Sequence, residues 1–281
     1  MKINNKKFNL LLKNKRVVFA VIFLTVVVLI SVFAPLLITV DRDQINTAIS
    51  NTPPSLEHLL GTDDLGRDIF VRLIYGGRIS LAVGMGATFI SVTIGVILGA
   101  TAGYFGGAID MVIMVLLDIF MCLPFFIIAI ILASLIGPSI WNSVIIIGFL
   151  GWTTIARIVR GEVLALKERQ FIEAARCIGM DSIGIIFKHI IPNIISSIIV
   201  YATLGIAGAI LAEAGLSYLG MGVKQPIPSW GNMLSTARNM RSLMLYWWEW
   251  APPGVMVFLT ILSINFMGDG LRNVIKPNAK E

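Results

Sequence analysis

Long uninterrupted runs of apolar residues dominate the pattern of this chain. About 20 mostly apolar residues are needed for a helix to cross a hydrocarbon layer of about 30 Å. The runs that approach this length lie at 17–40, 81–103, 111–136, 140–158, 190–212 and 252–267. They are continuous rather than alternating, which favours helices over a barrel. We therefore predict an all-α, polytopic membrane helix bundle with about six transmembrane helices. Five is the alternative count, because small and polar residues interrupt the fourth and sixth runs.

The composition agrees with a membrane protein. Hydrophobic residues make up 57% of the 281 residues and charged residues only 14%, and the mean hydropathy is +0.87. Soluble domains carry about 25% charged residues, so this chain lacks the polar surface that a water-facing domain needs. We expect membrane lipid to cover most of it.

The net charge of +6 indicates orientation rather than nucleic-acid binding. Fifteen of the 22 Lys and Arg residues lie before the first run, from Arg157 near the end of the fourth run to the start of the fifth, or after the sixth. Such a bias marks the cytoplasmic side. We predict cytoplasmic tails at 1–16 and 268–281 and an extracytoplasmic segment at 41–80. The run at 17–40 is longer than the 7–15 apolar residues of a signal peptide, so we predict an uncleaved first span.

Two extracytoplasmic segments contain further structure. The sequence at 67–75 predicts a short interfacial helix, with Asp68 and Arg72 one turn apart and apolar residues on its other face. The second segment, 215–250, ends in a cluster of three Trp residues before the sixth run. These favour a membrane-interface belt; stacking on a sugar or cofactor is the less favoured alternative.

Small residues recur every four positions in the second run, at Ala87, Ser91, Gly95, Gly99 and Gly103. This spacing predicts a groove in which another helix backbone approaches closely. A shorter series in the fifth run comprises Gly205, Gly208, Ala209 and Ala212. Packing within one subunit and a subunit or pore-lining interface are equally consistent with these patterns.

Three residues are candidates for a pathway or gate: Asp118 and Pro124 inside the third run, and Glu213 directly after the fifth. A carboxylate at the centre of a span costs about 2.5–3.5 kcal/mol, so Asp118 is expected to face protein or water. The favoured alternative places it near the cytoplasmic interface, where it snorkels to water or pairs with a neighbour. Pro124 should kink its helix, because it lacks the amide hydrogen of the helical ladder.

Catalytic patterns are absent from the sequence. It contains no Gly-x-x-x-x-Gly-Lys-Ser/Thr loop for ATP, no His-Glu-x-x-His and no Gly-x-Ser-x-Gly. The two cysteines and the two histidines are too far apart to predict a disulfide or a metal site. We predict no catalytic residue, metal or cofactor, and favour transport. A secondary transporter or channel acting alone is the alternative, with a membrane-embedded enzyme third.

The cytoplasmic loop at 159–192 carries the most informative pattern. Its mixed charge predicts a short exposed helix at 171–178, ended by Gly179, with Asp181 or Ser182 capping the next helix. Such a helix below the membrane would suit docking by a cytoplasmic partner.

The same loop resembles the EAA loop of binding-protein-dependent ABC transporter permeases. The resemblance rests on Glu173-Ala174-Ala175, on Gly179 and on Pro192. The His-Ile-x-Pro-Asn ending at 189–193 is typical of the peptide and nickel branch. Further similar segments lie at 60–68, 77–81, 151–152, 156–157, 159–162, 216–220, 228–231 and 265–272. Val115 departs from the family, which usually has Arg there before Asp118.

This resemblance is to the C-type permease of dipeptide, oligopeptide or nickel importers. It implies a type I importer fold, with the permease domain at 81–267, in a bacterial or archaeal cell membrane. It also implies a B-type permease partner, two cytoplasmic ATPases and an extracytoplasmic solute-binding protein. Glu173, Ala174, Ala175, Gly179 and Pro192 would couple to the ATPases. Peptides are the favoured substrate, and nickel or a metal–metallophore complex is the alternative.

Overall fold

The computed structural model describes residues 14–275, and within them the chain is built from helices and loops. The only bridge of strand type in that part joins Thr62 to Asp68. The membrane-length helices and their bent companions are α2 (Lys15–Val32), α4 (Ile69–Phe105), α5 (Gly107–Cys122), α6 (Phe125–Ile136), α7 (Ile140–Lys167), α10 (Ile191–Tyr218) and α13 (Trp247–Ile275). The shorter elements are α3 (Ala34–Leu37), η1 (Thr47–Ile49), α8 (Gln170–Cys177), α9 (Ser182–Ile185), η2 (Ile186–Ile190), α11 (Trp230–Leu234), η3 (Ser235–Arg238) and α12 (Met240–Leu245).

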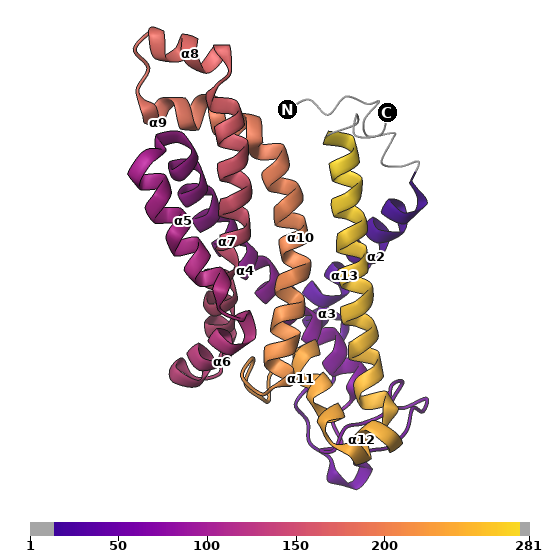
Figure 1. Ribbon diagram of the computed structural model, residues 1–281. Helices are drawn as coiled ribbons and strands as arrows, with labels where there is room; N and C mark the ends of the chain where they lie inside the picture. Colours follow the sequence, from indigo (N-terminus) through magenta and orange to yellow (C-terminus); the bar gives the residue numbers. More distant parts are fainter. Residues whose placement is uncertain (1–13, 276–281) are drawn as a thin grey trace.

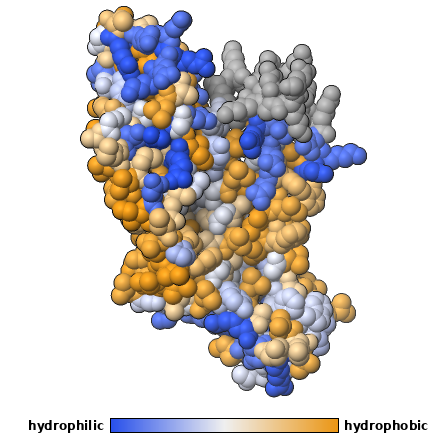
Figure 2. All heavy atoms as spheres, viewed as in Figure 1, coloured by the Kyte–Doolittle hydropathy of each residue, from blue (hydrophilic) through white to orange (hydrophobic). Residues whose placement is uncertain are grey.

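The fold is an all-α membrane bundle, as the apolar runs predict. Five helices among the described residues are long and apolar enough to cross a membrane, with α9, η2 and α10 counted as one, and the bent pair α5–α6 could supply a sixth crossing. Apolar side chains form a band around the middle of the molecule, and hydrophilic residues gather at its two ends (Figure 2). The expected count of about six agrees with this arrangement.

The third predicted span is a bent pair rather than one helix. The axes of α5 and α6 differ by 88° across the break. Leu123, which precedes Pro124, is extended (φ −95°, ψ 130°), because the proline ring disfavours helical geometry in the residue before it. Pro124 then occupies the N-cap of α6. The kink expected at Pro124 is therefore present, and it is sharp enough to end one helix and start another.

The interfacial helix predicted at 67–75 is wrong as a separate element, because α4 begins at Ile69 and runs on without a break to Phe105. Asp68 caps it by accepting a hydrogen bond from the Val71 amide at 3.0 Å. Arg72, which suggested a water-facing surface, is only 3% exposed because it pairs with Asp43. A buried ion pair therefore lets the helix continue through a charged stretch.

The long helices place two groups of loops at opposite ends of the bundle. The first residue of α2, the last residues of α13, and α8 with α9 lie at one end (Figure 1). The 41–68 segment, α11 and α12 lie at the other (Figure 1). Helices α4 and α7 make the most extensive contact, and α10 packs on α4 and α13. Most basic residues of the predicted tails, including Lys276 and Lys280, lie outside the described residues.

The predicted Trp belt is only partly a surface feature. Trp247 is 55% exposed, whereas Trp248 is buried against Ile69 and Met233. Trp248 therefore packs the first turn of α13 against the first turn of α4. The clustering of three Trp residues in the sequence could not indicate this contact.

Candidate functional site: an exposed loop helix and a membrane groove

Helix α8 lies beyond the ends of α4 and α7, on a hydrophobic base. Ile172 is fully buried and Ala175 is 4% exposed, and both belong to a cluster that includes Val163 of α7 and Ile185 of α9. Residues three apart lie on one helix face, so this pair fixes which side of α8 faces inward. Glu173 and Ala174 are exposed on the other side.

This orientation corrects one expectation about the Ala pair. Both Ala174 and Ala175 were expected to couple to the ATPases, but Ala175 packs against the chain itself. Only Ala174, next to Glu173, lies on the outward surface. Adjacent helical residues point about 100° apart, so one buried member leaves the other outside.

The end of α8 is a Schellman turn built on Gly179. Its φ is +80°, a left-handed conformation that side chains with a β-carbon seldom adopt. The Gly179 amide donates to the Arg176 carbonyl at 3.0 Å, and the Met180 amide to the Ala175 carbonyl at 3.1 Å, which is the Schellman pattern. Asp181 then caps α9 by accepting from the Gly184 amide. Gly179 thus occupies the position that the sequence predicts.

Pro192 lies apart from α8, near the start of α10, and is exposed. It follows η2, a single π-helical turn. Proline has no amide hydrogen with which to complete the α-helical hydrogen-bond ladder, and this accounts for a local change of helical pitch in the turn before it. Pro192 therefore shapes the link from the loop into α10 rather than the surface of α8.

Large apolar side chains are exposed around α8. The exposed fractions are 42% for Phe171, 78% for Ile178, 64% for Ile183 and 64% for Phe187. Soluble surfaces rarely gather so many large apolar groups, and these lie at the end of the bundle (Figure 1). The combination of apolar groups with the Glu173 carboxylate is typical of a protein interface.

Tyr104, near the end of α4, joins the loop to the bundle. The Arg176 guanidinium lies 5.5 Å and the Lys167 ammonium 5.9 Å from the centre of its ring, within cation–π range. Tyr104 also belongs to the hydrophobic cluster under α8. A displacement of α8 would therefore disturb the packing at the end of α4.

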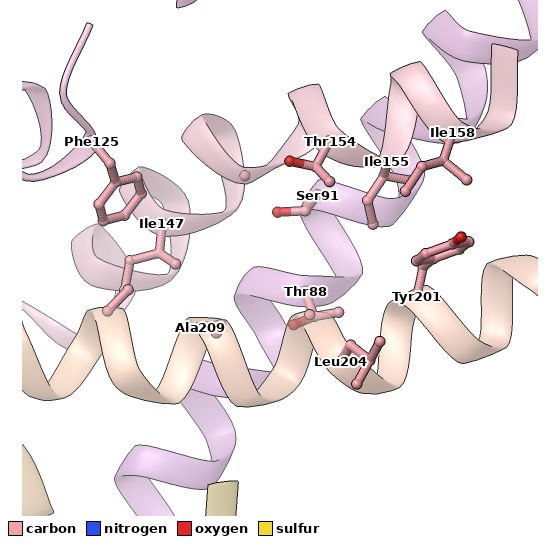
Figure 3. A pocket seen from close by; sticks show the side chains of 14 residues that line it. Thr88, Ser91, Phe125, Ile147, Thr154, Ile155, Ile158, Tyr201, Leu204 and Ala209 are labelled. Atoms are coloured by element: carbon pink, nitrogen blue, oxygen red, sulfur yellow. The ribbon is translucent and has the colours of Figure 1, made fainter. Parts of the chain in front are cut away.

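A groove of about 390 Å³ lies between α4, α7 and α10, with Phe125 of α6 at one side (Figure 3). Thr88, Ser91, Thr154 and Tyr201 supply its polar side chains, and the other walls are apolar or small. Among the described residues that line it, none carries a full charge at neutral pH.

The small residues of the fifth run line this groove. Gly205, Gly208, Ala209 and Ala212 are all wall residues, and a β-carbon on Gly208 would meet no atom within 4 Å. The series in the second run does the opposite and packs closely against α7: a β-carbon would come within 2.7 Å of Ile155 at Gly95, 2.5 Å of the Ala156 oxygen at Gly99 and 2.9 Å of the Arg160 oxygen at Gly103. Ala87 is fully buried, and the Ser91 hydroxyl donates to the Gly148 carbonyl at 2.8 Å.

The three pathway candidates occupy different environments. Pro124 lines a second cavity of about 420 Å³, which shares Phe125, Gly151 and Thr154 with the groove. Asp118 lies on the outside of α5 and accepts a 2.6 Å hydrogen bond from Arg157 of α7. Both side chains of this pair are more than half exposed, so Asp118 is paired with a neighbour, as the favoured alternative expected.

Glu213 does not line the groove and is fully buried. It accepts hydrogen bonds from the hydroxyls of Ser80 (2.9 Å) and Ser217 (2.7 Å), and the Trp230 amide donates to Ser80 at 3.1 Å. Glu213 therefore ties α4 and α10 to the start of α11. Its interpretation as a pathway residue is corrected to a structural one in this conformation.

A network of ion pairs at the opposite end of the bundle was not predicted from the sequence pattern. Arg67 bonds to Asp63 at 2.7 Å, and Arg72 approaches Asp43 at 3.2 Å and Asp63 at 3.7 Å. Of these four residues, Asp63, Arg67 and Arg72 lie in or near the 60–68 segment singled out in the sequence, and Asp43 lies outside it. Among the described residues, no three His, Cys, Asp or Glu side chains are placed to hold a metal ion.

The fold is a multi-pass membrane helix bundle of the class found in solved ABC transporters. The solved inward-facing structure of the MetNI methionine ABC transporter matches with a TM-score of 0.58 at 19% identity, over 72% of this chain and 96% of that one. At this identity the match concerns the fold alone.

Sequence comparison then identifies the family. Residues 95–281 match the family described as "Binding-protein-dependent transport system inner membrane component", and this chain belongs to it. Residues 8–54 match "N-terminal TM domain of oligopeptide transport permease C".

Individual relatives cover almost the whole chain. The dipeptide transport system permease protein DppC of Alkalihalophilus pseudofirmus is 42% identical over 97% of this chain and 89% of its own length. The oligopeptide transport system permease proteins OppC of Haemophilus influenzae and Bacillus subtilis are 41% and 38% identical, over 94% and 95% of this chain and 85% and 87% of their own lengths.

Proposed function

We propose that this chain is the C-type permease subunit of an ATP-driven peptide importer. The observation that carries the proposal is the exposed α8, held on a base formed by the same α4, α7 and α10 that line the groove. A partner that moves α8 can therefore change the groove. The names of the relatives, which are dipeptide and oligopeptide permeases, support peptides as the substrate.

The partners follow from the same arrangement. A B-type permease would cover the open side of the groove, and two cytoplasmic ATPases would bind the surfaces around α8 on the two permeases. A solute-binding protein would deliver peptide from outside. Glu173, Ala174 and Gly179 would form the contact with the ATPase, while Ala175 and Pro192 would hold the loop in place.

Peptides fit the groove better than a bare metal ion does. An extended peptide has a neutral backbone, and the groove offers hydroxyls and apolar walls with no charged side chain among its described lining residues. Bare nickel would prefer imidazole, thiolate or carboxylate ligands. A nickel–metallophore complex remains the second candidate, since its metal would arrive already ligated.

Uptake by the assembled importer tests this function. We expect radiolabelled dipeptides or longer peptides to enter vesicles that contain both permeases, the ATPases and the binding protein, with ATP inside. Uptake should persist in the presence of an uncoupler, because ATP rather than an ion gradient drives it. Uptake of a radiolabelled nickel complex that peptides do not compete with, or uptake by this chain alone, would contradict the proposal.

A second prediction concerns orientation. We propose that α8 and both chain ends are cytoplasmic, in line with the bias of Lys and Arg. Cys177 is an exposed natural reporter on α8, and Ser55 is exposed in the opposite loops. In a Cys122→Ala background, a membrane-impermeant thiol reagent applied to intact cells should label Ser55→Cys and spare Cys177. Labelling of Cys177 before the cells are opened would reverse the assignment.

A further inference from the structure

A small charged cavity lies at the end of the bundle opposite α8. Its volume is about 190 Å³, and its charged walls are Asp63, Asp64, Arg67, Arg72 and Glu249. The remaining walls come from Ile69 and the 225–236 segment. None of these residues lines the membrane groove, so the cavity is a separate site.

The two arginines in its wall are already engaged. Arg67 bonds to Asp63, and both side chains are less than a tenth exposed. Arg72 donates to the Asp43 carboxylate and to the Arg42 and Pro226 carbonyls, all at 3.2–3.3 Å. These contacts leave the cavity with two carboxylates that no arginine holds closely.

Those two carboxylates are Asp64 and Glu249, and they differ in exposure. Asp64 lies at the rim with its side chain 67% exposed, and its nearest cation is Arg67 at 3.9 Å. Glu249 is 3% exposed, and its Oε1 has no hydrogen-bond partner in the protein. A buried carboxylate without a partner is costly, so Glu249 is built to receive a donor.

The chemistry of the cavity favours an ammonium or guanidinium group as that donor. A metal ion is disfavoured because, in the part of the chain that the structure describes, no three His, Cys, Asp or Glu side chains are placed to hold one. The cavity has room for about six water-sized groups, and Ile69 and Met233 line it. Apolar walls of this kind suit the alkyl stem of Lys or Arg, whose charged end would reach Glu249.

We propose that this cavity receives one Lys or Arg side chain of the extracytoplasmic binding protein when that protein docks. The inference rests on the proposed function, which supplies a protein partner on this face. Asp64 at the rim would attract the basic group, and Glu249 at the base would accept its N–H bonds. A binding protein is favoured over the peptide itself because the walls belong to the outer segments and not to the groove.

The Glu249→Gln variant tests the site, since it keeps the shape and removes the charge. In the reconstituted importer, we expect the concentration of binding protein that half-maximally stimulates ATP hydrolysis to rise at least tenfold, because loss of one partner of a buried charge pair weakens association strongly. The maximal rate should change little. Glu57→Gln is the matched control: it removes an exposed carboxylate from the same outer region and should leave the half-saturating concentration unchanged.

A second measurement needs no variant. Methylguanidinium chloride should compete with the binding protein in the wild type, whereas tetramethylammonium chloride, a cation without N–H donors, should not. Equal half-saturating concentrations for wild type and Glu249→Gln, or no difference between the two salts, would overturn the proposal. A defect that appears only with peptides carrying a free amino group would assign the cation to the substrate and would also overturn it. Failure of the wild-type importer to respond to any binding protein would instead refute the proposed function.

Discussion

Gly179→Val is expected to reduce peptide uptake at least tenfold while the permease stays in the membrane at normal abundance. No atom lies within 4 Å of a β-carbon at this position, so the effect would come from the backbone alone. At φ +80° a β-branched residue is strongly disfavoured, and relaxing the strain would redirect the chain from α8 into α9. Uptake of labelled peptide, with co-purification of the ATPases, measures the effect.

Gly179→Asn provides the matched control, because Asn tolerates left-handed geometry. It should transport at close to the wild-type rate. Glu173→Lys reverses the charge on the same surface of α8. It should weaken ATPase binding if a basic residue of the ATPase faces Glu173. If Gly179→Val and Glu173→Lys both transport normally with ATPases bound, α8 is not the coupling element. A variant that binds ATPases and hydrolyses ATP without uptake would place the defect in transmission.

Gly99→Leu should prevent stable assembly of the permease. A β-carbon at Gly99 would lie 2.5 Å from the Ala156 oxygen and 2.9 Å from Val159, so α4 and α7 would have to separate along their main contact. Overpacking a core costs about 1–3 kcal/mol or more, and here backbone rather than a flexible side chain blocks the space. We expect membrane abundance to fall at least fivefold, measured by immunoblot of purified membranes.

Gly208→Leu separates packing from function. It adds the same side chain to another helical glycine, but one with open space around it that lines the groove. This variant should reach the membrane at normal levels and transport poorly, because the groove is narrower. Normal abundance of Gly99→Leu, or low abundance of Gly208→Leu, would contradict the roles assigned to the two small-residue series.

The pattern of apolar runs predicts the helices well but not where they bend or pair. Hydropathy reports which residues avoid water, so the bundle could be anticipated. Hydropathy cannot report how a charged side chain such as that of Arg72 is neutralised. The partners of Arg72 include Asp43, which is 29 residues away in the sequence. The predicted span therefore began at residue 81, twelve residues after the true start of α4 at Ile69. The break at α5–α6 was anticipated as a kink because proline acts locally.

The site residues divide in the same way. Backbone requirements, such as the left-handed glycine, are visible in a short motif. Which member of Ala174-Ala175 faces outward depends on what α8 packs against. The roles of Glu213 and Asp118 depend on contacts with Ser80 and Arg157 on other helices. The 60–68 segment marked a region of interest, but only the assembled fold brings it next to Glu249 to form a cavity.

Helix α4 has 37 residues, about 55 Å at 1.5 Å per residue, which is nearly twice the thickness of the hydrocarbon layer. One end supplies Ile69 and Arg72 to the outer cavity, and the other supplies Tyr104 to the base of α8. The two proposed binding events, one at each side of the membrane, would thus act on opposite ends of one continuous helix. Thermodynamic linkage makes such coupling reciprocal: if docking outside raises the affinity for ATP inside by a given factor, ATP must raise the affinity for the docked protein by the same factor.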